Sequence, residues 1–139
     1  MSFWLVKSGP GAFSWDAQVA NGVDPWTGVR NYQARKNLAA MKAGDRAFFY
    51  HSNVQRAIVG VVEVVREAYP DPTATDGAWV CVDVRTVGPM PRPVTLAEIK
   101  ADPELAELAL VRQSRLSVCP VSEEHWAYLC TMGGWAEPA

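Results

Sequence analysis

The chain has 139 residues, which fits one domain built around one hydrophobic core, so we expect a single domain over residues 1–139. Apolar residues make up 49% of it and charged residues 20%, which excludes an intrinsically disordered chain. The formal net charge of -2 argues against a protein that coats nucleic acid without specificity, because such domains are strongly basic. A local basic patch is still compatible with this charge, because a patch depends on where the charges lie.

The three cysteines, Cys81, Cys119 and Cys130, lie far apart and form no CxxC pair. Their odd number and the lack of a recognisable signal peptide indicate a reducing compartment, so we expect a cytoplasmic protein. The longest apolar runs are much too short to span a bilayer, so we expect no membrane partner.

The first half of the chain predicts alternating strands and helices. An apolar run at residues 3–7 is typical of a buried strand. Ser14 and Asn31 stand where each can cap the start of a helix, and Gly22 follows the end of the first one. The predicted elements are a strand at 3–7, a helix ending at Ala20, a loop carrying Trp26 and Gly28, a helix at 31–41, and strands at 46–52 and 57–68 joined by a turn with Asn53 and Gln55.

The second half predicts another long strand, short helices, and a last strand and helix. Residues 79–87 alternate between apolar and polar side chains, as in a half-buried antiparallel strand. Three prolines between Gly88 and Pro93 are expected to end that strand. The other predicted elements are a surface loop at 69–77, a helix capped by Thr95 and Glu98, a short helix from Asp102, a strand at 116–121, and a helix from Ser122 that ends near Gly133.

In total, the sequence predicts about five to six short, Val-rich strands that are not separated by regular crossover helices. This pattern favours an α+β protein, a small antiparallel β-barrel decorated by short helices, over a doubly wound sheet. Gly60, early in the strand at 57–68, is typical of a bulge or a barrel corner.

The segment from Trp26 to Arg35 holds two large aromatic rings, two guanidiniums, two amide side chains and a Gly. No packing pattern requires this mixture. Single-stranded and flipped-out bases are bound by such groups: a flat ring for stacking, an amide that reads a base edge, and a guanidinium for phosphate. The segment therefore favours a nucleic-acid site.

Catalytic and metal sites find little support in the sequence. His51 and His125 are the only histidines, and His125 falls in the first turn of the last predicted helix. No GxSxG surrounds any Ser, and neither a P-loop nor a GxGxxG occurs. Isolated histidines with scattered cysteines do not form a metal-ligand pattern. We therefore expect no catalytic residue, no metal and no cofactor.

Two pairs of polar residues stand at predicted strand ends. Lys7 and Ser8 follow the first strand, and His51 and Ser52 close a later one. Each pair is compatible with a solvated strand end. In a small barrel, however, strand ends gather at one mouth, so both pairs could share a site with Trp26.

A basic group precedes the last predicted strand. Arg112, Arg115 and Ser117 lie in one short polar string, and each arginine alone is compatible with an ordinary surface residue. With Arg30, Arg35 and Lys36 the two would form a basic rim on an otherwise acidic protein. Guanidiniums suit phosphate because they donate two hydrogen bonds from a fixed fork.

The order of these motifs resembles the EVE domain. The N-terminal half carries WLVKS at 4–8, WTGVRNYQAR at 26–35, GD at 44–45 and YHS at 50–52. The C-terminal half adds GVVEVV at 60–65, YPDP at 69–72, WV at 79–80, RQSRLSV at 112–118 and PV at 120–121. The resemblance covers nearly the whole chain, and its two longest strings, GVRNYQAR and RQSRLSV, are specific.

The resemblance implies a PUA-like pseudo-barrel, related to YTH and ASCH domains, that binds nucleic acid. In YTH relatives the ligand is a methylated adenine in an aromatic cage, and in EVE domains a modified base, often a cytosine derivative in DNA. By this resemblance the strand-end pair and the tryptophan line a pocket, with further polar groups near it: Lys7, Ser8, Trp26, Asn31, His51 and Ser52.

One position departs from the family pattern. The family usually reads Lys-Ser-Glu-Pro after the first strand, whereas this chain has Gly9 between Ser8 and Pro10. A carboxylate accepts a hydrogen bond from an exocyclic amine such as cytosine N4, and Gly9 cannot.

The resulting hypothesis is a non-enzymatic, monomeric module that binds a modified base in DNA or RNA. The base leaves its stack and enters an aromatic pocket, at a cost of a few kcal/mol for a paired base. In this hypothesis Trp26 stacks on the base and is opposed by Trp79 or Tyr32. Polar side chains read its edge (Ser8, Asn31, Ser52), and cationic ones hold flanking phosphates (Lys7, Arg30, Arg112, Arg115).

Two alternatives stay open. ASCH-type relatives include amidohydrolases that act on acylated nucleosides with a Lys in the barrel. Lys7 would play that part, with Glu63 or Asp83 as its partner. The other alternative is a protein-interaction module whose aromatic side chains bind a peptide.

Overall fold

The computed structural model describes residues 1–9, 11, 13–52 and 55–137, so that Asn53 of the predicted turn lies outside the described residues. Within them the chain forms six strands, five α-helices and one 3₁₀ helix. In chain order these are β1 (Phe3–Ser8), α1 (Trp15–Asn21), β2 (Val23–Pro25), α2 (Tyr32–Ala40), β3 (Arg46–His51), β4 (Ala57–Pro70), β5 (Val80–Thr95), α3 (Leu96–Ala101), η1 (Pro103–Leu105), α4 (Ala109–Arg112), β6 (Val118–Val121) and α5 (Glu123–Gly133).

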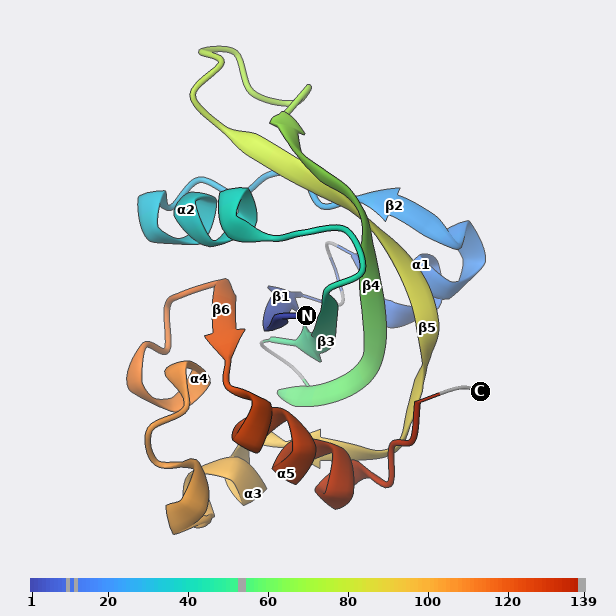
Figure 1. Cartoon of the computed structure of the whole chain (residues 1–139), viewed down its shortest axis with the longest axis vertical. Helices are drawn as coiled ribbons and strands as arrows, with labels where there is room; N and C mark the ends of the chain where they lie inside the picture. The colour runs from blue at the N-terminus through green and yellow to red at the C-terminus, as the bar shows by residue number, and fades with distance from the viewer. Residues whose placement is uncertain (10, 12, 53–54, 138–139) are drawn as a thin grey trace.

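The described strands form one curved sheet in the order β2-β5-β4-β3-β1-β6, and β4 and β5 run through it as long, bent ribbons (Figure 1). The α+β class is confirmed. The predicted antiparallel barrel differs in two ways: β1 pairs with β3 in parallel, and the hydrogen-bonded order ends at β2 and β6 instead of closing. Beside β6, a chain of short helices packs at one end of the sheet (Figure 1).

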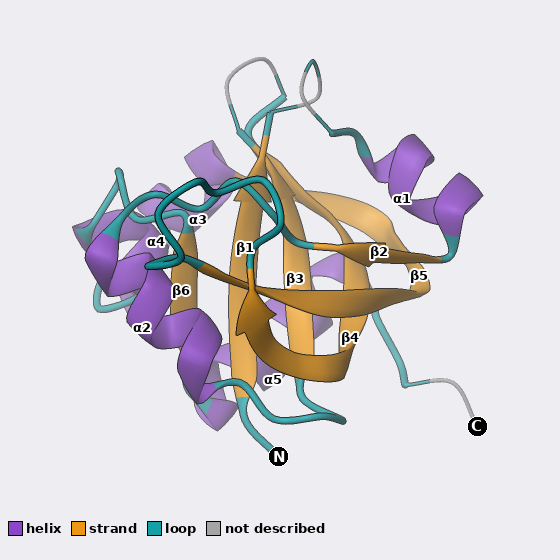
Figure 2. Cartoon of the chain, turned by 90° about the horizontal axis from the view of Figure 1, so that it is seen from above, coloured by secondary structure: helices purple, strands orange, loops and turns teal. Residues whose placement is uncertain are grey.

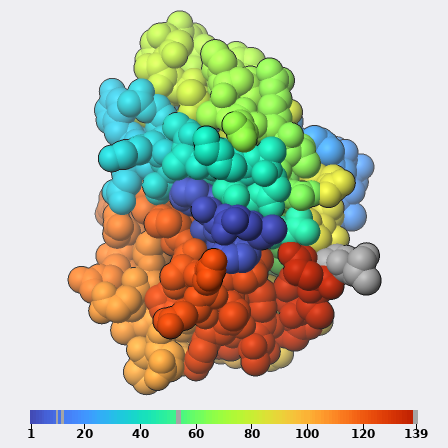
Figure 3. Space-filling model, in the orientation of Figure 1, coloured from blue at the N-terminus to red at the C-terminus, as the bar shows by residue number. Residues whose placement is uncertain are grey.

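The central strands β1 and β3 carry the hydrophobic core. Phe48 and Phe49 are both fully buried, and α5 covers this part of the sheet through Trp126, whose ring stacks on Phe48 at a centroid distance of 3.9 Å. In the space-filling view the N-terminal residues, in dark blue, lie between the blue-green α2–β3 region and the red C-terminal region (Figure 3).

The predicted helix caps are present. The side chains of Ser14, Asn31 and Ser122 accept hydrogen bonds from backbone N–H groups in the first turns of α1, α2 and α5. Thr95 and Glu98 form the predicted capping box at α3. These side chains satisfy N–H groups that have no partner within their own helix. Because each cap is formed by residues that are close in the sequence, the starts of these helices were predicted correctly.

Gly60 lies beside the irregularity that the sequence predicted. The β3–β4 register shifts between Phe49 and Tyr50, which pair with Gly60 and Ile58. A Cβ at Gly60 would lie only 2.3 Å from the Trp15 ring, so no other residue fits there without moving that ring. Gly60 thereby allows α1 to pack closely on β4.

The prediction that prolines end a strand after residue 87 is wrong. β5 continues through Pro89, Pro91 and Pro93 to Thr95 and pairs with β4 along this stretch. The three prolines alternate, so their missing N–H groups fall on one edge of the strand. In the described residues, β2 pairs only with 83–85 of β5, so this half of β5 has no strand neighbour on its other edge.

The parallel pairing of β1 and β3 brings the two strand-end pairs together. Lys7 lies opposite Tyr50 and Ser8 opposite His51, and the Ser52 N–H donates to the Ser8 carbonyl at 3.0 Å. The C-terminal ends of β1 and β3 lie at the same end of the sheet (Figure 2). The two pairs of polar residues therefore lie side by side.

Neither a membrane-spanning helix nor a metal-ligand cluster occurs among the described residues. No helix among residues 1–9, 11, 13–52 and 55–137 is long and apolar enough to cross a membrane. Across the same ranges, no three His, Cys, Asp or Glu side chains gather in a group that could hold a metal ion.

Candidate functional site

A cavity of about 560 Å³ lies beside the end of β1. It is bounded by β1, the loop before α1, β2 with the segment that leads into α2, and the residue before β6. Its lining consists of Lys7, Ser8, Phe13, Asp24, Pro25, Trp26, Thr27, Gly28, Val29, Arg30, Asn31 and Ser117. Pockets of this volume, with aromatic walls and a few polar groups, are typical of small-ligand sites, which range over roughly 300–1,000 Å³.

The aromatic wall of this cavity is formed by Trp26 and Phe13. Their rings lie 6.1 Å apart at an interplanar angle of 80°. Trp26 is also edge-on to Phe49, at 5.3 Å, and its backbone N–H donates to the Val82 carbonyl at 2.7 Å. Only 6% of Trp26 is exposed, so its ring is fixed by its neighbours.

Lys7 and Ser8 supply polar groups from the end of β1. The Lys7 Nζ donates to the Ser114 carbonyl at 2.9 Å, and burial lowers the pKa of Lys7 although Cys119 opposes the shift. The Ser8 hydroxyl donates to the Phe13 carbonyl at 2.7 Å and so ties the loop before α1 back to β1. Lys7 keeps donor capacity toward the cavity, because an ammonium has three N–H groups.

Asn31 both lines the cavity and caps the start of α2. Its Oδ1 accepts from the Ala34 N–H at 2.9 Å as the helix cap. Its Nδ2 makes no hydrogen bond within the described part of the chain, and the side chain is exposed. Asn31 therefore keeps its Nδ2 as an unused donor among the described residues that line the cavity.

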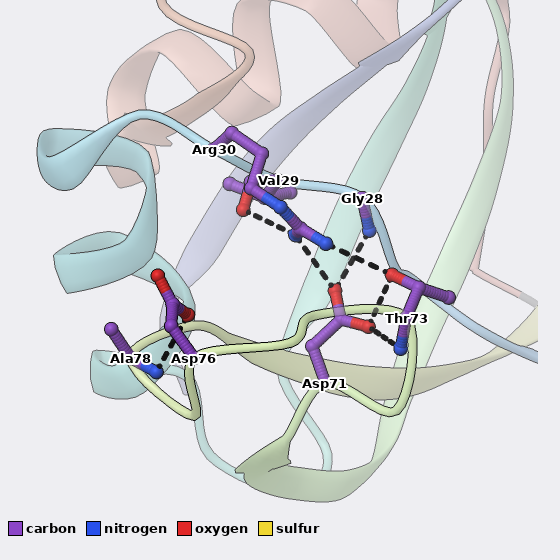
Figure 4. Close-up of polar contacts among 7 residues, drawn as sticks. All are labelled: Gly28, Val29, Arg30, Asp71, Thr73, Asp76 and Ala78. Atoms are coloured by element: carbon purple, nitrogen blue, oxygen red, sulfur yellow. Dashed lines mark hydrogen bonds and ion pairs between the residues drawn. The ribbon is translucent and has the colours of Figure 1, made fainter.

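Asp71 holds the cavity segment in place from the loop between β4 and β5 (Figure 4). Its side chain is fully buried and accepts from the Gly28 N–H at 2.8 Å and from Arg30 at 3.1 Å. Its other oxygen accepts from the N–H and the hydroxyl of Thr73. Gly28 takes a positive φ of 82°, which favours glycine here.

The pKa of Asp71 reflects this arrangement. Burial alone would raise the pKa, but the hydrogen bonds from Thr73, Gly28 and Arg30 outweigh it and lower the pKa to about 2. Arg30 also donates to the Thr73 hydroxyl at 3.0 Å. The guanidinium of Arg30 thus lies at the cavity with much of its hydrogen-bonding capacity already used.

His51 and Ser52 lie outside the lining of this cavity. The His51 Nε2 accepts from the Trp15 N–H at 2.9 Å, and its Nδ1 lies 2.6 Å from the Gln55 Oε1. Both ring nitrogens therefore have protein partners, which positions the start of α1. Ser52 lines a neighbouring cavity of about 300 Å³, together with Lys7, Tyr50, Arg56, Leu96, Lys100, Leu110 and Ser114.

Tyr32 and Trp79 also lie outside the cavity and form a surface cluster with two arginines. Their rings are 5.0 Å apart, and 69% of Tyr32 is exposed. The Arg35 guanidinium lies 5.2 Å from the Tyr32 ring and that of Arg30 lies 5.8 Å from the Trp79 ring. The structure does not bring these two aromatic rings opposite Trp26.

The residues predicted to form the rim also lie in two places, some at the main cavity and others outside it. Ser117 lines the main cavity. Arg112 and Arg115 line an adjacent hollow of about 320 Å³ that shares Asn31 with it. Arg112 pairs with Glu107, whereas Arg115 makes no ion pair within the described residues.

The two carboxylates that the amidohydrolase alternative requires lie elsewhere. Glu63 pairs with Arg46 at 3.1 Å and with Arg85, and Asp83 accepts from the Tyr69 hydroxyl at 2.5 Å. Neither carboxylate lines a cavity that contains Lys7.

Phe13, Asp24 and Asp71 are among the residues at the site that sequence reasoning missed. Phe13 and Asp24 line the cavity, and Asp71 fixes its edge. Asp24 belongs to the short edge strand β2, directly before the loop that the sequence predicts around Trp26 and Gly28. Asp71 lies in a polar, proline-rich loop far along the chain, and no spacing rule connects it to Gly28.

The chain is similar to several known proteins. Thymocyte nuclear protein 1 of Mus musculus is 34% identical, in an alignment that covers 94% of this chain and 73% of that protein. Protein Atu2648 from Agrobacterium tumefaciens is 52% identical, with a TM-score of 0.96 over 99% of this chain and 97% of that one. Human THYN1, in a crystal structure of its complex with DNA that contains 5-methylcytosine, is 34% identical, with a TM-score of 0.89 over 99% of this chain and 100% of that one.

A more distant likeness concerns the fold alone. The YTH domain of Zygosaccharomyces rouxii MRB1 superposes with a TM-score of 0.61 at 18% identity, covering 98% of this chain and 88% of that one. This likeness shows that the two chains share a fold. The family model of the EVE domain matches residues 2–132, and the chain therefore belongs to the EVE domain family.

Proposed function

We propose that this protein binds nucleic acid through a modified base that leaves its stack and enters the cavity beside β1. The observation that carries the proposal is the lining of that cavity, where two aromatic rings, Trp26 and Phe13, meet the polar groups of Lys7 and Asn31. A stacking surface beside groups that can read a base edge is the arrangement by which extruded bases are bound.

The related human protein supports the chemical class of the ligand. THYN1 was crystallised with DNA that contains 5-methylcytosine, and 99% of the present chain superposes on it. We extend this ligand class to the present chain, with 5-methylcytosine in DNA as the first ligand to test.

The two aromatic rings suggest how the base would be held. Trp26 and Phe13 stand at 80° to each other, so a flat base that lies on one ring meets the edge of the other. Edge-to-face contact is favourable because the edge of a ring is positive and its face negative. Stacking contributes roughly 1–3 kcal/mol per base.

Flanking phosphates would be held by the cationic side chains that still have unused hydrogen-bond donors. Arg115 makes no ion pair within the described residues, and Lys7 borders both the main cavity and the neighbouring one. Arg30 and Arg112 are paired with Asp71 and Glu107, so they would contribute less. The proposed mode is binding without catalysis.

The experiment compares oligonucleotides that differ only in one methyl group. Fluorescence anisotropy would give the Kd of the wild type for DNA with cytosine or 5-methylcytosine at one position. Trp26→Phe keeps an aromatic core residue and should weaken binding of the methylated DNA about fivefold or more, a part of the roughly 1–3 kcal/mol that stacking contributes. Trp79→Phe is the matched control and should keep the wild-type ratio of the two Kd values.

A wild type that binds both oligonucleotides equally would contradict the proposal. So would a Trp26→Phe variant that stays folded, as judged by its circular dichroism and Tm, and keeps the wild-type Kd values. We also propose that the chain acts as a monomer in the cytoplasm, which light scattering of the purified protein and imaging of a tagged copy in the cell would test.

A further inference from the structure

Asp24 is a carboxylate that faces the cavity from β2. It lies directly opposite Val84 in the antiparallel β2–β5 pair, and opposed residues of such a pair point to the same face of the sheet. Val84 is 1% exposed, so this is the inner face. The neighbours of Asp24, Val23 and Pro25, are exposed and alternate with it.

The chemical character of Asp24 differs from that of the other cavity residues. It is the one carboxylate among the described residues that line the cavity. Its Oδ2 accepts from the Asn21 side chain, which leaves Oδ1 without a partner in the described part of the chain. A carboxylate near nucleic acid repels phosphate, so its place in this cavity favours a role in which it accepts a hydrogen bond from the ligand.

Asp24 is the strongest acceptor in the described lining, because the other acceptors there are neutral. The Ser8 hydroxyl donates to the Phe13 carbonyl and keeps only neutral lone pairs, and one lone pair of the Asn31 Oδ1 is used by the helix cap. Lys7 and the Asn31 Nδ2 can only donate. The cavity therefore combines donors with one anionic acceptor.

This combination matches one kind of base edge. Cytosine offers an exocyclic N4 amine as donor, whereas thymine carries the O4 acceptor at the same position. A carboxylate binds the amine and repels O4. We propose that Asp24 accepts a hydrogen bond from the exocyclic amine of the bound base, so that the cavity selects amine-bearing bases over their keto counterparts. This inference rests on the proposed binding of a base in the cavity.

The test uses 5-methylcytosine and thymine, which differ in the groups at positions 3 and 4 of the ring but share the methyl group. Single-stranded oligonucleotides with either base at one position would be titrated with the wild type, which should prefer 5-methylcytosine by about 5- to 150-fold, the range of one good base-edge contact. In Asp24→Asn the ratio should fall towards one, because an amide accepts from N4 or donates to O4. In Asp24→Ala the affinity for 5-methylcytosine should fall and that for thymine should rise, because the hydrogen bond to N4 and the repulsion of O4 are both lost.

Two control variants distinguish a direct contact between Asp24 and the base from a general effect of charge and from an effect of the Asn21 hydrogen bond. Asp16→Asn removes an exposed carboxylate of α1 that does not line the cavity, so it should raise all affinities together and keep the ratio. Asn21→Ala removes the hydrogen bond to Asp24 but keeps the carboxylate, and it should also keep the ratio.

The outcomes distinguish this inference from the proposed function. If the wild type prefers 5-methylcytosine over cytosine, but Asp24→Asn keeps the full preference over thymine, the role of Asp24 is wrong and the proposed function stands. A wild type that binds 5-methylcytosine and thymine equally, while preferring both to cytosine, also overturns the inference alone. If the wild type does not distinguish 5-methylcytosine from cytosine, the proposed function itself fails.

Discussion

Two aromatic regions lie next to each other in this chain but are built in opposite ways. Around Trp26 the rings are buried, edge-on to one another, and form the wall of a cavity. Around Tyr32 and Trp79 the rings lie on the surface, with arginine guanidiniums placed over them. The first region can enclose a base, whereas the second offers an open platform.

The helix cap at Asn31 separates the two regions. Before it, the chain continues from β2 and is held against the sheet by the Trp26 N–H and by Asp71. After it, α2 begins, and Tyr32 in the first turn is left exposed. An aromatic-rich segment therefore does not by itself identify a pocket, because backbone geometry decides which ring is enclosed.

The largest expected difference between the regions is in stability. Trp26→Ala should lower the free energy of unfolding by about 3–5 kcal/mol, as for other buried large-to-small substitutions. Tyr32→Ala should cost only about 0.5–1 kcal/mol, the contribution of an exposed cation–π pair. Urea denaturation of both variants gives the comparison, and equal losses would show that Trp26 is not the better-packed ring.

The next effect concerns Asp71, which fixes the edge of the cavity. Asp71→Asn should lower the free energy of unfolding by about 1.5–3 kcal/mol at pH 7, because the hydrogen bonds from Arg30, Gly28 and Thr73 lose their charged acceptor. The folded pKa of about 2 lies below the ordinary value of 3.8, so the charge stabilises the fold above that value. The gap between wild type and variant should therefore shrink as the pH falls from 3.8 to about 2.

Asp76→Asn is the matched control for Asp71, since Asp76 lies in the same loop and is exposed (Figure 4). Its cost should stay within about 0.5 kcal/mol, as for ordinary surface substitutions. If urea denaturation over this pH range gave a constant gap for Asp71→Asn, the buried carboxylate would not be the source of the stabilisation.

A smaller effect should follow from opening the surface cluster. Tyr32→Ala removes an exposed ring, so it should weaken binding of methylated and unmethylated oligonucleotides by the same factor and keep their ratio. The ratio is measured by anisotropy with both oligonucleotides. A variant that lost the preference for 5-methylcytosine would mean that the cluster, and not the cavity, reads the base.

The smallest effect is expected from the rim. Arg115→Ala should reduce the slope of log Kd against log salt by about one, the value for one lost phosphate contact. Arg112→Ala should change it less, because Glu107 already pairs with that guanidinium. Titrations over a series of NaCl concentrations would measure both slopes, and equal changes would contradict the assignment.

Much of the fold was predictable because its signals are local. The caps at Ser14, Asn31 and Ser122 follow from side-chain chemistry within one helical turn. The continuation of β5 through three prolines was not predictable, because it depends on which edge of that strand has a neighbour. The parallel pairing of β1 and β3 likewise depends on the whole sheet.

The residues of the site likewise divide into those that local sequence could predict and those that it could not. Lys7, Ser8 and Trp26 were selected from strand ends, a loop and a family resemblance, and they line one cavity. His51 shares the strand end, but both of its ring nitrogens are engaged by Trp15 and Gln55. Local sequence does not reveal such partners, because they come from elements that only the complete fold brings together.

The central claim is that the base enters the cavity and does not lie on the surface cluster. The most direct measurement is a two-dimensional ¹H–¹⁵N NMR titration of the tryptophan indole N–H signals, with the Trp26 and Trp79 signals assigned from Trp26→Phe and Trp79→Phe. DNA with 5-methylcytosine should shift the Trp26 signal more than DNA with cytosine, while the Trp79 signal responds equally to both. A methyl-dependent shift of Trp79 with no change at Trp26 would contradict the claim.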